Sequence, residues 1–286
     1  MKVVISLLAP LCLIMFLSSC TRIIYIGKRV EPEIILEKKH NDIVFINLFD
    51  YTLPENVKQK ASVGYQAGVT GLVEGLSSFS SDSSFSFLIG DTLRRGIKTG
   101  FLTTLLPEDT ISDICDRYNC NLLLALDSLS IFFDSETNVD DDNEGINRTK
   151  NFYLNTRFFL SLYSSTGDLI NRSEVDQSSL YRSRPTLYGF ITIEPSLAKA
   201  RVAVGNQSFQ AGEDYVDKFF PKFFQETKQL YTGKLFRESN QYVFAKNWNK
   251  AIELLEQLAK NQDTVIVNKA RYNMDIVKEA AEADKK

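Results

Sequence analysis

The sequence predicts a mixed α+β or α/β fold: a small mixed sheet packed with helices over residues 33–190, then an all-helical region over residues 195–286. Three observations support this prediction. Strand-like and helix-like segments alternate along the first part of the chain, as they do in α/β layers. Two long segments of alternating hydrophobicity then flank a tight turn, as in a β-hairpin. Beyond Pro195, apolar residues recur at helical spacing.

The first half of the sheet is expected from short apolar segments. Residues 33–37 read Glu-Ile-Ile-Leu-Glu, and residues 43–49 form an apolar run that suits a strand buried on both faces. Residues 85–90 alternate in the way of a further strand. Between the last of these and the next apolar strand, at residues 122–133, a helix is predicted from Pro107 to Asn119, because proline favours the first turn of a helix.

The second half of the sheet is expected to be a long antiparallel hairpin. Apolar residues alternate over residues 152–162, a turn follows at 165–168, and residues 169–175 return. The acidic stretch 138–145 before it resembles the start of a calcium loop, but Asn151 stands where such a loop requires glutamate. An acidic hairpin loop is the favoured interpretation, and no metal site is predicted.

A helix over residues 61–80 carries glycines spaced 4, 3 and 4 residues apart, which places them on one helical face. Each glycine costs about 1 kcal/mol in a helix interior, so four of them need a reason. The stripe could bind another backbone, for example in an oligomeric export component. Alternatively, the helix could pack tightly on its own sheet or be partly irregular. These weak binding candidates are Gly64, Gly68, Gly71 and Gly75.

The C-terminal region is predicted to be helical throughout. A first helix should run from Pro195 to about Leu230, because phenylalanines recur at i, i+4 positions, and Pro221 should kink or divide it. Three amphipathic helices should follow, at residues 235–246, 248–260 and 264–283. Around Trp248 and Ala251, and again at Arg-Tyr-Asn-Met (271–274), the sequence resembles a tetratricopeptide unit, which implies that Trp248 packs between paired helices.

The first twenty residues have the organisation of a signal peptide. Lys2 precedes an apolar run over residues 3–17, which as a helix would measure about 22 Å against a hydrocarbon core of roughly 30 Å. The small residues Ser18 and Ser19 suit a signal-peptidase site. The stretch Leu-Ser-Ser-Cys resembles the lipobox of bacterial lipoproteins, which implies cleavage between Ser19 and Cys20 and attachment of acyl chains such as palmitate to Cys20.

We therefore expect residues 1–19 to be removed and residues 20–32 to form a tether. Thr21 follows the cysteine, and no acidic residue precedes Glu31. By the sorting rules of such lipoproteins, this implies the outer membrane and, more specifically, its periplasmic face. The alternatives are an ordinary secretory signal and an uncleaved N-terminal anchor.

Composition argues against several functional classes. The net charge is −3, from 33 basic and 36 acidic residues, which is unfavourable for a nucleic-acid partner. Cys115 and Cys120 could pair in an oxidising compartment, although two small buried thiols are the favoured interpretation. The single histidine, His40, lies in a polar turn, so Ser-His or Cys-His catalysis is not expected. No cofactor motif is found.

The strand at 43–49, the helix leading into residues 121–129 and the tail containing residues 271–274 together resemble a family of uncharacterised Bacteroidota envelope lipoproteins. The α/β part also resembles, loosely, the sheet domain of curli-secretion and penicillin-binding-protein-activator lipoproteins. Neither resemblance implies a catalytic residue. The predicted function is a non-enzymatic, lipid-anchored interaction or assembly module with an envelope protein partner, and the alternative is a carboxylate-based periplasmic hydrolase.

Overall fold

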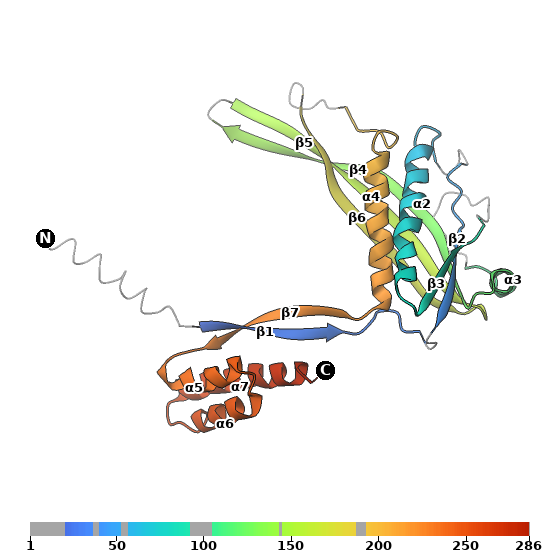
Figure 1. Ribbon diagram of the computed structural model, residues 1–286. Coiled ribbons are helices and arrows are strands. Elements are labelled where there is room, and N and C mark those ends of the chain that lie inside the picture. The colour runs from blue at the N-terminus through green and yellow to red at the C-terminus, as the bar shows by residue number, and fades with distance from the viewer. Residues whose placement is uncertain are drawn as a thin grey trace. The chain divides into compact units, whose positions relative to one another are not determined.

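The computed structural model describes residues 21–36, 40–52, 57–91, 105–142, 145–186 and 193–285. The chain divides into two compact units, which are shown in Figure 1. The sheet unit comprises residues 32–220, and the ribbon unit combines residues 221–285 with the N-terminal segment up to Glu31. Both units mix helices with strands, which confirms the predicted fold class.

A five-stranded mixed sheet forms the centre of the sheet unit. Its strand order is β3 (Phe85–Ile89), β2 (Asn41–Asn47), β4 (Leu122–Asp142), β5 (Gly145–Ser164) and β6 (Leu169–Pro185). The first three strands run parallel to one another, and the last three form an antiparallel meander. The expected strands at 43–49, 85–90 and 122–133 and the hairpin after them are therefore present.

Helices cover both faces of this sheet. Helices α2 (Ser62–Leu76) and α4 (Arg201–Val216) lie side by side over one face, and α3 (Glu108–Tyr118) packs on the other. Short 3-10 helices follow α2 and α4, at Ser77–Ser81 and Asp217–Phe219. Alternate residues of β4 enter the two cores, which explains why the start of this strand is continuously apolar.

The ribbon unit pairs the first strand of the described chain with a strand near residue 225. Strand β1 (Thr21–Val30) runs antiparallel to β7 (Lys222–Tyr231). A 3-10 helix at Lys234–Phe236 leads into α5, which is followed by α6 and α7. Buried residues of the ribbon and of these helices share one hydrophobic core. The three helices span Arg237–Phe244, Trp248–Leu258 and Thr264–Ala283.

Several expectations about the elements were wrong. Residues 21–30 of the expected tether form β1, and residues 222–231, expected to be helical, form β7. Pro221 lacks the N–H that a helix interior requires, and the backbone groups beyond it pair with β1 instead. Residues 33–36 are not a strand.

Two further differences concern boundaries. Helix α4 packs within the sheet unit, so the expected division near residue 195 is replaced by one near residue 220. The acidic stretch is mostly strand, since β4 continues to Asp142 and pairs with Gly145. The predicted signal peptide, with Ser19 and Cys20, lies outside the described residues.

Candidate functional site

The glycine stripe is used inside the sheet unit. A Cβ atom at Gly71 would overlap the carbonyl oxygen of Gly205 in α4, and one at Gly75 would overlap that of Phe209. In the opposite direction, a Cβ at Gly212 would lie 2.6 Å from the carbonyl oxygen of Leu72. The backbones of α2 and α4 are therefore in direct contact, which only glycine at these positions permits.

The other two glycines of the stripe are also covered. A Cβ at Gly64 would lie 2.9 Å from Cβ of Leu197, and one at Gly68 would lie 2.9 Å from Cδ1 of Ile131 in the sheet. The structure shows close packing of the stripe within the chain, but Gly71 and Gly75 pack on α4 rather than on the expected sheet. All four glycines are buried, and Gly71 also borders the groove described next.

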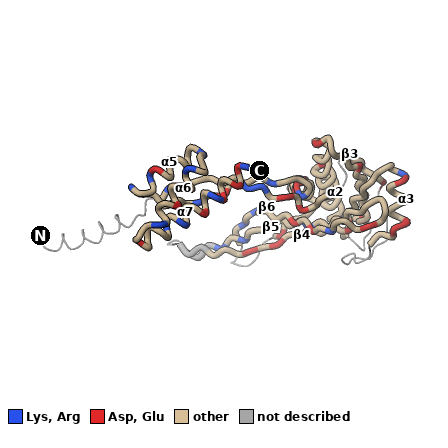
Figure 2. Tube along the Cα trace, turned by 90° about the horizontal axis from the view of Figure 1, so that it is seen from below, with Lys and Arg blue, Asp and Glu red and all other residues tan. Residues whose placement is uncertain are grey.

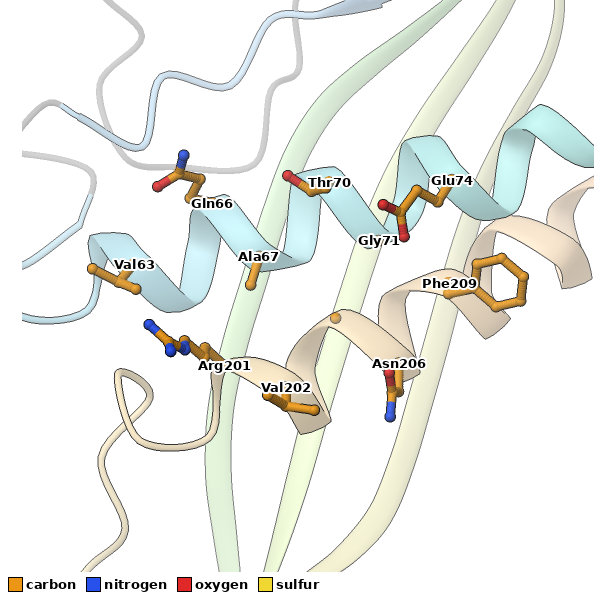
Figure 3. Close-up of a pocket in the computed structure, with 11 residues that line it drawn as sticks. Val63, Gln66, Ala67, Thr70, Gly71, Glu74, Arg201, Val202, Asn206 and Phe209 are labelled. Carbon is orange, nitrogen blue, oxygen red and sulfur yellow. The ribbon is translucent and has the colours of Figure 1, made fainter.

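A groove remains along the outer side of this helix pair, with a volume of about 560 Å³ (Figure 3). Three of its apolar side chains are substantially exposed: Val63 at 43%, Val202 at 68% and Phe209 at 39%. Figure 3 shows Arg201 near the Val63 end of the groove and Glu74 towards the Phe209 end. The groove thus presents apolar contact area between two opposite charges. Gln66, Ala67, Thr70 and Asn206 complete most of its lining.

The wall of the groove formed by α4 is fixed to the sheet beneath it. The Gln207 side-chain amide donates to the carbonyl oxygen of Leu154 at 3.0 Å and to the Ser179 hydroxyl at 3.3 Å. The Gln177 amide on β6 donates to the Asp214 carboxylate. Because these contacts join α4 to β5 and β6, the groove is carried on a preformed surface.

Asp127 is a buried carboxylate that the sequence interpretation missed. It lies in the register shift between Leu126 and Ser128, accepts a hydrogen bond from the Ser161 hydroxyl at 2.5 Å and lies 3.5 Å from Arg172 Nε. Desolvation by burial raises the pKa of the Asp127 carboxyl, although Ser161 and Arg172 act in the opposite direction. The sequence signal that could have indicated this buried carboxylate is the presence of an acidic residue inside the apolar run 122–133.

A carboxylate-based hydrolase requires a second carboxylate roughly 5–10 Å from the first, across the substrate. The direct contacts of Asp127 are with the Ser161 hydroxyl and the Arg172 guanidinium. Those partners suit a buried polar group that is satisfied within the fold.

Trp248 has a structural role in the ribbon unit. Its indole N–H donates to the Asp284 carboxylate at 3.1 Å, and its ring packs against the core that contains the fully buried Ala251. This agrees with the packing expected from the tetratricopeptide resemblance. Trp248 also borders a shallow groove of about 480 Å³ between the start of α6 and the end of α7.

The two cysteines and the histidine that were singled out from the sequence also contact neighbouring groups within the fold. Cys115 and Cys120 are both free and buried, and their hydrogen bond together with burial raises the pKa of the Cys115 thiol. His40 is exposed, with Nδ1 3.1 Å from the carbonyl oxygen of Ser83 and Nε2 3.4 Å from Asp42. Within the described ranges, no three His, Cys, Asp or Glu side chains gather as a metal site requires.

Charge is distributed without a dominant sign. Figure 2 shows basic and acidic residues interspersed along the chain in both units. In the described part of the chain, no helix combines the length and apolar character needed to span a membrane.

Fold and site together define a two-unit α+β protein whose surface carries a groove along a pair of closely packed helices. The chain belongs to the family described as a domain of unknown function, DUF8603, whose profile matches residues 46–231. Those residues run from β2 to the end of β7, and they include both helices of the groove.

Solved structures show only distant similarity. A hypothetical protein from Chlamydia trachomatis is 12% identical over 49% of this chain and 73% of its own, with a TM-score of 0.27. A putative neuraminyllactose-binding hemagglutinin homologue from Helicobacter pylori is 14% identical over 66% of this chain and 87% of its own, with a TM-score of 0.26. Similarity at this level says nothing about function. The comparison with curated proteins gave no significant match.

Proposed function

We propose that this protein is a lipid-anchored, non-enzymatic interaction module of the bacterial outer membrane, attached through Cys20 and facing the periplasm. The leader sequence supports the anchor. The groove on α2 and α4 is the observation that supports partner binding. Its exposed valines and phenylalanine form an apolar strip with polar and charged neighbours, which is the usual composition of a protein-binding surface.

A protein partner suits this groove better than a small molecule does. The apolar side chains line an open channel along two helices, whereas small-molecule sites bury most of their ligand. Arg201 and Glu74 lie towards opposite ends, so a bound polypeptide with complementary charges would have a preferred direction. The groove is also held by glycine contacts and by Gln207, so little ordering is needed on binding.

The anchor makes a direct prediction for the mature protein. Intact-mass analysis of protein purified from its native membrane should show residues 1–19 removed and acyl chains on Cys20. Detergent should be required for its extraction, because several acyl chains anchor stably. A Cys20→Ala variant should carry no acyl chains. A free thiol at position 20, or a retained leader, would contradict the proposed anchor.

The groove makes a second prediction. After cross-linking in intact cells, the Val202→Asp variant should recover at least about tenfold less of any stoichiometric partner than the unmodified protein, since a charge at the centre of an apolar contact costs well over 1 kcal/mol. Val202 is exposed, so the fold should persist.

Val265→Asp is the matched control for this experiment, because Val265 is also an exposed helical valine but lies on α7, outside the groove. Partner recovery should be unchanged in this control. Equal recovery with both variants would show that the groove is not the binding surface. The hydrolase alternative has no comparable support, since Asp127 is engaged by Ser161 and Arg172.

A further inference from the structure

We propose that the exposed face at the start of β1, which carries Ile23 and Tyr25, is a membrane-contact surface that binds the interfacial region of a phospholipid bilayer. This inference rests on the proposed acylation of Cys20 and adds to it a specific contact. The anchor would then hold the ribbon unit directly on the bilayer rather than at the end of a free tether.

The first step concerns chain length. Strand β1 begins at Thr21, the residue immediately after the proposed acylation site. At about 3.3 Å per residue, Ile23 lies roughly 10 Å and Tyr25 roughly 17 Å along the chain from Cys20. The polar interfacial layer of a bilayer is several ångströms deep on each side. An acylated Cys20 therefore brings both side chains to the interfacial layer when β1 lies along the bilayer surface.

The second step concerns exposure. Ile24 and Ile26 point into the core of the ribbon unit, whereas Ile23 and Tyr25 alternate with them and are 49% and 63% exposed. A large aliphatic and a tyrosine side chain exposed together are costly in water but favourable at a bilayer surface. Tyrosine in particular prefers the headgroup level, where its ring and its hydroxyl are both satisfied.

The third step concerns charge on the same face. Ile23 pairs with Gln229 and Tyr25 pairs with Thr227, so the neighbouring positions on β7 are polar but uncharged. The acidic residue next to Thr227, Glu226, is the register partner of the core residue Ile26 and forms ion pairs with Lys28 and Lys228. The contact surface therefore does not present a free carboxylate from this part of β7 to lipid phosphates.

The fourth step concerns the residues at the same end of the ribbon. Thr21 pairs with Tyr231, whose ring contacts that of Tyr272 at 5.2 Å and lies 5.2 Å from the Lys269 ammonium. The guanidinium of Arg22 lies 5.6 Å from the ring of Phe244. Cations held beside aromatic rings combine attraction to phosphate with the ring chemistry that favours the membrane interface.

The experiment uses the full mature protein, with its acylation verified by intact mass, in vesicles of phosphatidylethanolamine and phosphatidylglycerol. A cysteine-directed environment-sensitive fluorophore is placed at Tyr25→Cys. Cys115 and Cys120 are buried and should not react. The label should shift to the blue and lose about half of its emission when nitroxide-bearing lipid is included, because its site lies in the interfacial layer.

Gln257→Cys on α6 provides the control, since this exposed site belongs to a helix that packs on α7 rather than on the ribbon. Its label should keep an aqueous spectrum and remain unquenched. Gly27→Cys is a second test position on β1, where an added Cβ meets nothing within 4 Å, so the fold should tolerate it. Quenching there should exceed that at Gln257→Cys.

The outcomes separate this inference from the proposed function. If the mass shows acyl chains but the labels at positions 25 and 27 behave like that at 257, the contact surface is wrong and the anchor stands. If the labels change only in native membranes and not in lipid vesicles, the surface binds a protein and the lipid proposal is overturned. If acyl chains are missing, the anchor and this inference fail together.

Discussion

Replacing Gly71 with alanine is expected to lower the free energy of unfolding of the sheet unit by about 3 kcal/mol, at the upper end of the usual overpacking range. The added Cβ would overlap the carbonyl oxygen of Gly205, which is backbone and cannot rotate away. The helices must therefore separate, which also loosens the contacts of Gly75 and Gly212. The gain in helix propensity, about 1 kcal/mol, is too small to compensate.

Gly205→Ala is the matched control for this prediction. It changes a glycine of the partner helix, but its Cβ would lie 3.8 Å from the nearest atom, the carbonyl oxygen of Ala67. We expect this variant to be neutral or to stabilise by up to about 1 kcal/mol through helix propensity. Hydrogen exchange in peptides from α2 and β4 would report the sheet unit separately. Equal loss of protection in both variants would refute close backbone packing as the reason for the stripe.

Replacing Asn273 with alanine is expected to destabilise the ribbon unit by about 3 kcal/mol, because a buried polar group that loses its partner costs about 1–3 kcal/mol. The Asn273 side chain is fully buried, and it accepts from the Tyr231 N–H and donates to the Tyr231 carbonyl oxygen, both at 2.8 Å. These two bonds join α7 to the last residue of β7. Asn240 also donates to that carbonyl oxygen, so the orphaned Tyr231 N–H carries most of the loss.

The single tryptophan makes this prediction measurable. Trp248 packs in the ribbon unit, so its fluorescence during urea unfolding reports that unit alone. Asn261→Ala is the control, since the exposed Asn261 caps only a local turn through Asp263 and should cost well below 1 kcal/mol. A midpoint for Asn273→Ala that coincides with that of the control would rule out the buried amide as a link between α7 and β7.

The sequence correctly predicted helix ends that are determined by interactions between residues close together in the chain. Helix α7 was expected over residues 264–283 and has those bounds, because Asp263 caps its first turn and its apolar stripe continues to the end. The end of α3 at Asn119 was also correct, since asparagine tolerates the left-handed conformation observed there, with φ of 51°. Both outcomes follow from interactions within a few residues.

Long-range pairing explains the largest errors. Phe223 and Phe224 of β7 follow Phe219 and Phe220 at i, i+4 spacing and so satisfied a helical pattern. The segment is nevertheless a strand, because β1 pairs with it along its whole length. The same pairing explains why the expected tether is a strand, since residues 21–30 pair with β7. A residue pair such as Thr21 and Tyr231, which lie about 210 residues apart in the sequence, leaves no trace in local periodicity.

The features of the candidate site also divide into those that local spacing predicts and those that depend on long-range contacts. Glycine spacing alone determined that one face of α2 must accept close contact, and the apolar run around residue 124 alone determined a buried strand. Only the tertiary structure decided that α4 packs against Gly71 and Gly75, that a groove runs along the outer side of this helix pair, and that Asp127 meets Ser161. Spacing along a chain specifies which side chains share a surface, whereas the identity of the opposite surface depends on contacts between residues far apart in sequence.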